Sequence, residues 1–292
     1  MTRQQALRLR SGQALRRAAA LLAEAGIDEA ALEAEVLLRH ALSLDRTQLY
    51  LRLGDELPAQ ADSAYQASLQ RRLQREPTAY IVGHKEFYGL ALEVGPGVTI
   101  PRPETELLVE EALTQARRML QRAPSVTIVD VGTGCGGIAL ALASHLPAAR
   151  VIATDVSPAA LSFARRNAET LGLTPHVCFI CGDLLSPLRQ PIDVIVANLP
   201  YVKSSAWLEL APEIRCHEPR QALDGGPDGL RLIERLLRQA PTHLRPGGAV
   251  LLEIGYDQGP AATALAAATF PKAAIAVKKD LASLDRMLVV QL

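Results

Sequence analysis

Residues 126–137 of this 292-residue chain read VTIVDVGTGCGG, an apolar run that passes directly into a glycine-rich loop. A short run rich in β-branched residues predicts a buried strand, and the glycines allow a tight turn into the next helix. Helices are expected at 137–146, 157–171 and 228–239. Further strands are expected at residues 151–155, 177–181, 192–197, 249–254, 273–277 and 286–291, the last two as an antiparallel edge pair. Such alternation predicts an α/β fold with a doubly wound, mostly parallel sheet, whose ligand crevice lies at the carboxyl ends of the strands.

The chain before this sheet follows a different pattern. Through about residue 75 the apolar residues recur at helical spacing, as at Leu15, Ala18 and Leu22. Short β-like runs separated by glycines then follow, which is typical of a hairpin. We therefore predict three parts: an N-terminal helical domain at 1–80, a β-hairpin linker at 81–100, and the α/β domain at 101–292.

The composition argues against several classes of protein. Lysine plus arginine and aspartate plus glutamate are equal at 31 each, so we expect no stable nucleic-acid binding. No apolar run approaches the roughly 18 to 20 residues of a membrane span, and no membrane association is expected. The first residues hold several arginines and no acid before Glu24, as an organelle transit peptide also does. The amphipathic pattern continues beyond that point, which favours an ordinary helix of a cytoplasmic protein.

Two of the four cysteines, Cys178 and Cys181, form a C-x-x-C pair. They lie in an apolar run that we interpret as a buried strand, where residues three apart face opposite sides. A zinc site would also require a second pair at similar spacing. We therefore expect no metal.

The glycine-rich loop matches the G-x-G-x-x-G spacing through Gly132, Gly134 and Gly137, which serves NAD and S-adenosyl-L-methionine equally well. Charge separates the two ligands. Asp130, at the end of the first strand, would repel a pyrophosphate, whereas S-adenosyl-L-methionine carries an ammonium and a sulfonium group and no phosphate. The methyl donor is therefore favoured over a dinucleotide.

Two more acids follow the next two strands. Asp155 closes the second strand, a position from which a carboxylate accepts hydrogen bonds from both ribose hydroxyls of either cofactor. Asp183 follows the third strand and can meet an adenine amino group. Acids at three successive strand ends support the methyl donor. The alternative to an enzyme is a nucleotide-binding scaffold that transfers no methyl group.

The fourth strand ends in Asn198-Leu199-Pro200-Tyr201. An amide or exocyclic amine nitrogen is a poor nucleophile because its lone pair is delocalised. The Asn198 side-chain oxygen and the Leu199 carbonyl can accept both of its N–H hydrogens and stabilise the positive charge that develops. Pro200 restricts the turn, and Tyr201 offers a flat face to a planar substrate. These residues predict methyl transfer to a planar N–H₂ group.

The chain resembles the PrmC/HemK family of release factor glutamine methyltransferases over nearly its whole length. The residues that carry this resemblance form these blocks: 75–77 and 80–83 (REP, YIVG), 87–89 (FYG), 100–106 (IPRPETE), 198–201 (NLPY), 218–226 (EPRQALDGG) and 252–255 (LEIG). The resemblance implies a seven-stranded Rossmann-like methyltransferase sheet with a small N-terminal helical domain.

The resemblance also implies roles for particular residues. It places these residues around S-adenosyl-L-methionine: Gly132, Thr133, Gly134, Cys135, Gly136, Asp155, Asp183 and Leu184. We expect Asp130 and Asn198 to belong to the same site. Asn198, Leu199, Pro200 and Tyr201 would receive the glutamine of the Gly-Gly-Gln motif of class I peptide chain release factors. The N-terminal helices would help to dock that partner.

The sequence departs from the family pattern at two positions. The family usually has proline where this chain has Leu199, and serine or threonine where it has Cys135. Because the backbone carbonyl of residue 199 is the functional group, the chemistry should survive with a less rigid turn. Leu199 also makes the turn similar to that of rRNA adenine dimethyltransferases, so an adenine-N6 methyltransferase acting on rRNA or DNA is the alternative.

Overall fold

The structure is a computed structural model that describes residues 9–292. The first eight residues, with part of the arginine-bearing stretch that resembles a transit peptide, lie outside the described residues. Contacts along the chain define two compact units. The first comprises the described residues up to 83 together with 212–217, and the second comprises residues 84–211 and 218–292.

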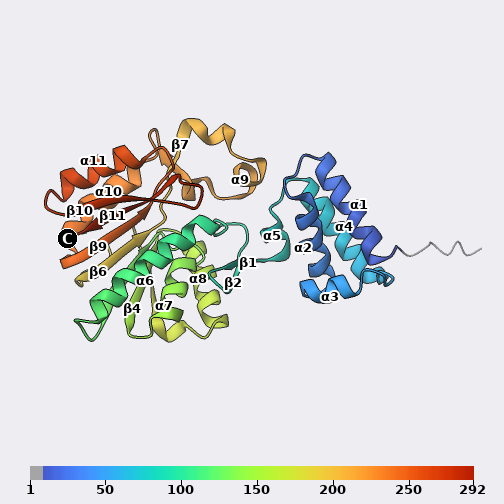
Figure 1. Ribbon diagram of the computed structural model, residues 1–292, viewed down its shortest axis with the longest axis horizontal. Coiled ribbons are helices and arrows are strands. Elements are labelled where there is room, and N and C mark those ends of the chain that lie inside the picture. The colour runs from blue at the N-terminus through green and yellow to red at the C-terminus, as the bar shows by residue number, and fades with distance from the viewer. Residues whose placement is uncertain (1–8) are drawn as a thin grey trace, which may run out of the picture. The chain divides into compact units, whose positions relative to one another are not determined.

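The N-terminal unit is helical (Figure 1). Its helices are α1 (Ser11–Glu24), α2 (Ala30–Leu42), α3 (Arg46–Leu51), α4 (Ala59–Leu73), α5 (Thr78–Val82) and α9 (Pro212–His217). The apolar stripes of the long helices meet in one core, in which Leu22, Leu37 and Leu38 are fully buried. Tyr65 of α4 lies in the same core and donates a hydrogen bond to the Ala34 carbonyl of α2 at 3.0 Å. The helical prediction for this region is thus confirmed.

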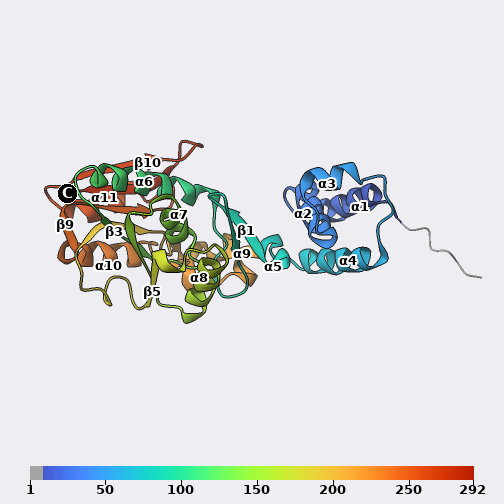
Figure 2. The same ribbon diagram turned by 90° about the horizontal axis from the view of Figure 1, so that it is seen from below.

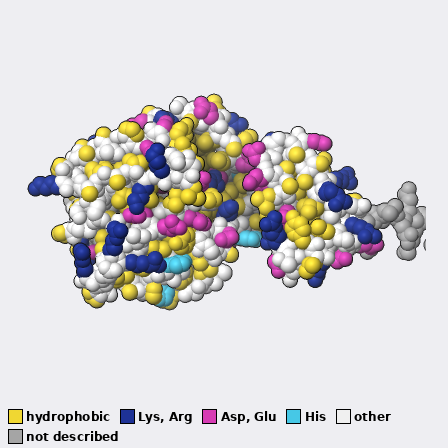
Figure 3. Space-filling view, viewed as in Figure 1, with side chains coloured by type: hydrophobic (Ala, Val, Ile, Leu, Met, Phe, Trp, Pro, Cys, Tyr) yellow, Lys and Arg dark blue, Asp and Glu magenta, His cyan; other side chains and the backbone are white. Residues whose placement is uncertain are grey.

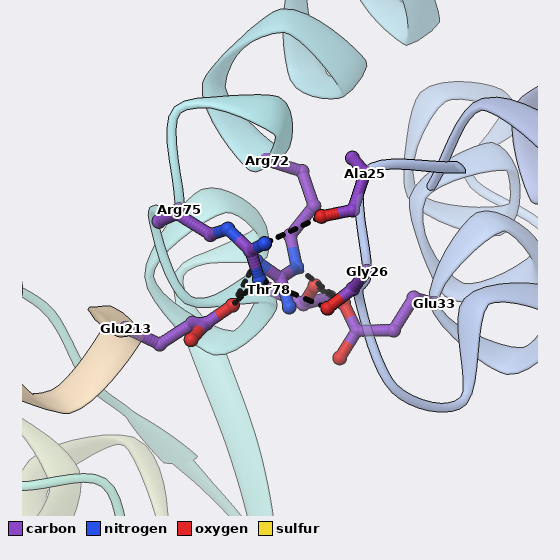
Figure 4. A network of polar contacts seen from close by, with 7 residues as sticks. All are labelled: Ala25, Gly26, Glu33, Arg72, Arg75, Thr78 and Glu213. Atoms are coloured by element: carbon purple, nitrogen blue, oxygen red, sulfur yellow. Dashed lines mark hydrogen bonds and ion pairs between the residues drawn. The ribbon is translucent and has the colours of Figure 1, made fainter. Parts of the chain in front are cut away.

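A polar network joins α9 to the other helices of this unit, although more than 120 residues separate it from them in sequence (Figure 4). Arg72, whose side chain is 6% exposed, donates to Glu33 at 2.8 Å and to Glu213 of α9 at 2.9 Å. Arg75 also donates to Glu213, at 3.2 Å. The Thr78 hydroxyl completes the network by donating a hydrogen bond to the Glu33 carboxylate. Buried charges require such partners, so these contacts stabilise the attachment of α9.

The second unit contains a hairpin and a seven-stranded sheet. The hairpin pairs β1 (His84–Phe87) with β2 (Leu90–Glu93). The sheet strands are β3 (Val126–Val131), β4 (Ala149–Asp155), β5 (Val177–Cys181), β6 (Ile192–Ala197), β9 (Leu244–Glu253), β10 (Ala274–Lys279) and β11 (Asp285–Gln291). Their order is β10-β11-β9-β6-β3-β4-β5, with β11 antiparallel to both of its neighbours and the other pairs parallel. The predicted doubly wound, mostly parallel sheet is confirmed.

Helices cover both faces of this sheet (Figures 1 and 2). On one face lie α6 (Glu106–Leu120), which follows a short turn η1 (Pro103–Thr105), then α7 (Gly137–His145) and α8 (Pro158–Thr170). On the other face, α10 (Arg231–Gln239) and α11 (Gly259–Thr269) pack on an apolar core. Ser157 caps α8 by accepting a hydrogen bond from the Ala160 N–H, and Pro158 occupies the first helical position.

Short elements complete the second unit. They are β7 (Val202–Lys203), η3 (Ser204–Glu209), η4 (Arg220–Ala222), β8 (Asp224–Gly226), η2 (Thr174–His176) and η5 (Ala240–Thr242). β7 and β8 pair in parallel, and β8 contacts α10.

Cys178 and Cys181 lie in a strand as predicted, but the prediction that they are buried was wrong. The strand, β5, has the predicted bounds, but it is the last strand of the sheet and both cysteines are exposed. An edge strand has a neighbour on one side only, and the apolar run does not indicate its place in the sheet. Among the described residues, no group of three or more His, Cys, Asp or Glu side chains could hold a metal ion.

Candidate active site

The candidate site lies where the order of the sheet reverses. From β3 the chain continues through β4 to β5 on one side, then returns to β6 on the other side of β3. Val131 at the end of β3 is paired with Ala197 at the end of β6. The glycine-rich loop and the Asn198 turn therefore begin side by side, at the topological switch point where open α/β sheets bind ligands.

The glycine-rich loop has a backbone that only glycine adopts easily. Gly132, Gly134 and Gly136 have φ angles of 75°, 58° and 91°. A Cβ on Gly132 would lie 3.0 Å from Cδ2 of Leu199, so the loop packs directly on the Asn198 turn. The Gly132 N–H donates to the Thr154 carbonyl at 2.8 Å, which ties the loop to the neighbouring strand. These glycines bring bare backbone to the edge of the sheet.

Asp130 lies beneath this loop and has no exposed surface. Its Oδ2 accepts hydrogen bonds from the Thr133 hydroxyl at 2.6 Å and from the Ala139 N–H of α7 at 3.1 Å. Its buried Oδ1 has no hydrogen-bond partner within the described chain. Burial raises the pKa of this carboxyl to about 7, because removal from water disfavours the charged form. A cation bound nearby would lower this pKa and so favour the ionised Asp130 carboxylate.

A cavity of about 420 Å³ opens beside the loop, within the size range of about 300–1,000 Å³ that is usual for small-molecule sites. Asp155, Asp183 and Leu184 all line it, together with Gly132 and Asn198. It therefore brings together residues from the ends of four adjacent strands.

The carboxylate of Asp155 is held by two backbone groups. Oδ2 accepts from the Gly134 N–H at 2.9 Å, and Oδ1 accepts from the Ser157 N–H at 2.8 Å. Each oxygen keeps a second lone pair for a ligand. Burial raises the pKa of Asp155, and these two hydrogen bonds act against that shift. Asp183 is paired with Arg235 of α10 at 2.5 Å, and both residues line the cavity.

A smaller cavity of about 120 Å³ adjoins the first and shares Gly132, Gly134 and Asn198 with it. The residues of the Asn198 turn line it, from Asn198 to Tyr201. The other lining residues include Phe87, Ile100, Arg102, Thr105, Thr133, Cys135 and Glu218. The arrangement places a second, smaller recess next to the larger one, and Asn198 lines both.

The Asn198 turn is held by buried polar contacts. Asn198 Nδ2 donates to the Thr105 hydroxyl at 2.9 Å, and that hydroxyl donates to Glu253 Oε2 at 2.6 Å. The Tyr201 hydroxyl donates to Glu253 Oε1 at 3.1 Å. Burial raises the pKa of Tyr201, and the nearby Glu253 charge raises it further, so the hydroxyl keeps its proton. Glu218 accepts from the Ile100 N–H at 3.2 Å and pairs with Arg102.

Most of the predicted site residues meet at these cavities. Asp130 and Gly136 have other surroundings: Asp130 lies beneath the loop, and a Cβ on Gly136 would lie 3.1 Å from Ala164 of α8. The roles of Thr105 and Glu253 were not predicted. The only signal in the sequence was that both belong to blocks of the family resemblance, IPRPETE and LEIG.

The surface of the protein agrees with its zero net charge. On the face seen in Figure 3, basic and acidic side chains are interspersed and form no continuous basic stripe. Nucleic-acid-binding surfaces usually carry such a stripe. Across residues 9–292, no helix has the length and apolar character needed to cross a membrane.

The sheet order, the antiparallel β11 and the glycine-rich loop at the switch point define a methyltransferase fold. Residues 128–217 match the family model described as methyltransferase domain. A methyltransferase from Pyrococcus furiosus shares this fold, with a TM-score of 0.51 and 20% identity over 76% of this chain and 96% of that one.

The N-terminal unit narrows the class to one family. Residues 13–83 match the family model described as PrmC N-terminal domain. The release factor glutamine methyltransferase of Moorella thermoacetica is 47% identical over 98% of this chain and 97% of its own. That of Cereibacter sphaeroides is 42% identical over 97% and 99%. The chain belongs to the family of release factor glutamine methyltransferases.

Proposed function

We propose that this protein transfers the methyl group of S-adenosyl-L-methionine to the side-chain amide nitrogen of the glutamine in the Gly-Gly-Gln motif of class I peptide chain release factors. The observation that carries the proposal is that Asn198 lines both cavities. Its Nδ2 is bonded to Thr105, so its Oδ1 is left to accept a hydrogen bond from a substrate. The named function of the relatives supports this choice of substrate.

The larger cavity suits S-adenosyl-L-methionine in its size and in the charge of its lining residues. Asp155 has lone pairs available for ribose hydroxyls, and Asp183 with Leu184 lines the part where we expect the adenine. The unpartnered Oδ1 of Asp130 favours a cationic ligand through its field, because a positive charge nearby stabilises the ionised carboxyl. Gly132 and Gly134 leave room for the ligand to approach the backbone.

When bound, S-adenosyl-L-methionine supplies an electrophilic methyl group. Asn198 Oδ1 and the Leu199 carbonyl accept the two N–H hydrogens of the glutamine amide, which directs the nitrogen lone pair toward that methyl. With S-adenosyl-L-methionine bound, the N–C bond would form as its C–S bond breaks, and the two acceptors would stabilise the positive charge on nitrogen. One N–H proton then leaves to water, so the residues act as orienting acceptors and no titrating base is needed.

We further propose that the N-terminal helices help to dock the release factor, since a cavity of about 120 Å³ offers a large partner little contact area. We also propose that the protein acts in the cytoplasm, where its proposed partner would be found. We expect neither membrane association nor stable nucleic-acid binding, in agreement with the balanced charge.

Incubation with labelled S-adenosyl-L-methionine and a purified release factor tests the proposal. We expect one methyl group on the Gly-Gly-Gln peptide by mass spectrometry, and none when that glutamine is replaced by alanine in the release factor. Stripped rRNA and DNA serve as competing acceptors. Label in nucleic acid alone would instead support the adenine-N6 alternative, and stabilisation against heat by NADH but not by S-adenosylhomocysteine would contradict methyl transfer altogether.

A further inference from the structure

The Asn198 side chain is the end of a buried chain of hydrogen bonds. The chain runs from Asn198 Nδ2 to the Thr105 hydroxyl, then to Glu253, which also accepts from Tyr201. Thr105 is 5% exposed and Glu253 is 2% exposed, so water does not compete for these contacts. Thr105 precedes α6 and Glu253 ends β9, which puts each in a different element from the Asn198 turn.

The chain has a direction because a hydroxyl carries a single proton. An ionised carboxylate only accepts hydrogen bonds, so Glu253 accepts one from the Thr105 hydroxyl. The Thr105 oxygen can then only accept, and Asn198 must present its N–H₂ group to it. The opposite rotamer of the amide would bring two acceptor oxygens together in a buried place, where an unmade hydrogen bond costs about 1–3 kcal/mol. Asn198 Oδ1 is therefore directed away from Thr105.

We propose that Thr105 and Glu253 are positioning residues for the methyl acceptor, which fix the Asn198 amide so that Oδ1 faces the substrate nitrogen. This inference rests on the proposed function, in which that oxygen accepts a substrate N–H. An amide in the opposite orientation presents a donor to a donor and cannot hold the substrate nitrogen. The Glu253 carboxylate thus sets the orientation of the Asn198 amide through Thr105, without contacting Asn198 itself.

Protonation of Glu253 would reverse the direction of the hydrogen bonds that link it to Thr105 and Asn198. A carboxylic acid can donate to the Thr105 hydroxyl, which then donates to Asn198 Oδ1 and turns Nδ2 toward the substrate. Tyr201 and Arg286 of β11 favour the charged form of Glu253, and Glu104 opposes it. Burial is the largest influence and raises the pKa of Glu253. Methyl transfer should therefore decline as the pH falls through that pKa, even when S-adenosyl-L-methionine is saturating.

Three variants test the inference with the release factor as acceptor. Thr105→Val removes the hydroxyl at nearly constant volume, and we expect kcat to fall at least about tenfold, since a buried orienting hydrogen bond is lost. The dissociation constant for S-adenosylhomocysteine should stay within about threefold of the parent value. Thr105→Ser keeps the hydroxyl and should recover most of the lost rate. Thr114→Val, at an exposed threonine of α6, is the matched control.

Glu253→Gln supplies a readout that a merely structural role would not change. Glutamine does not titrate, so the acid limb of the kcat profile that belongs to Glu253 should disappear, while the parent and Thr114→Val keep it. Parent-like kcat in Thr105→Val, a Thr105→Ser variant no faster than Thr105→Val, or an unchanged acid limb in Glu253→Gln would each overturn the positioning role. Absence of transfer by the parent protein would instead overturn the proposed function.

Discussion

Replacement of Asn198 by alanine removes the side-chain acceptor at the reacting nitrogen and leaves the Leu199 carbonyl in place. A preorganised polar group at developing charge typically contributes about 2.7–4 kcal/mol, which corresponds to about 10²–10³ in kcat. Because one of the two acceptors remains, we expect kcat to fall by about that factor.

The same variant should leave the fold and the larger cavity nearly intact. Asn198 makes one side-chain hydrogen bond, to Thr105, and such a bond contributes about 1 kcal/mol to stability. Thr105 keeps its bond to Glu253, so no buried hydroxyl is left without a partner. The midpoint of thermal unfolding should therefore fall by only a few degrees.

Single-turnover transfer of labelled methyl to a release factor measures the rate, and calorimetry with S-adenosylhomocysteine measures cofactor affinity. The expected pattern is a large loss of rate with a dissociation constant within about threefold of the parent. Rates within threefold of the parent would refute the orienting role of Asn198. A loss of cofactor affinity as large as the loss of rate would assign Asn198 to the cofactor and not to the acceptor.

Three further predictions concern the glycine-rich loop and the N-terminal unit. Because Asp130 has a pKa of about 7, binding of S-adenosyl-L-methionine at pH 7 should release up to about half a proton, and the affinity should weaken at lower pH. Calorimetry in two buffers of different ionisation enthalpy measures this proton release, which should be lost in Asp130→Asn. Gly132→Ala should weaken cofactor binding at least about tenfold in the same assay, since φ is 75° and the new Cβ would lie 3.0 Å from a Leu199 methyl. Glu213→Gln should lower the free energy of unfolding by about 1–3 kcal/mol in urea, because Arg72 loses a charged partner; an unchanged midpoint would show that this ion pair adds no stability.

The local features of this protein could be predicted from its sequence. Apolar periodicity predicted the strands and helices, since each depends on side chains only a few residues apart. The bounds of β5 and β6 agree with the prediction residue for residue. The glycine-rich loop, Asp155 and the Asn198 turn were found in the same way, because each follows directly after a strand and all strands of one direction end at one edge.

Contacts between residues far apart in the sequence became known from the fold. No periodicity brings Thr105 to Glu253, which are 148 residues apart, or α9 to Arg72. It was likewise the strand order that left Cys178 and Cys181 exposed, and the packing of α7 on the sheet that buried Asp130 beneath the loop instead of at the cavity. Burial and hydrogen-bond partners depend on how elements pack, and packing involves the whole chain at once. For that reason the Asn198 turn was visible in the sequence, while the residues that orient it were visible only in the fold.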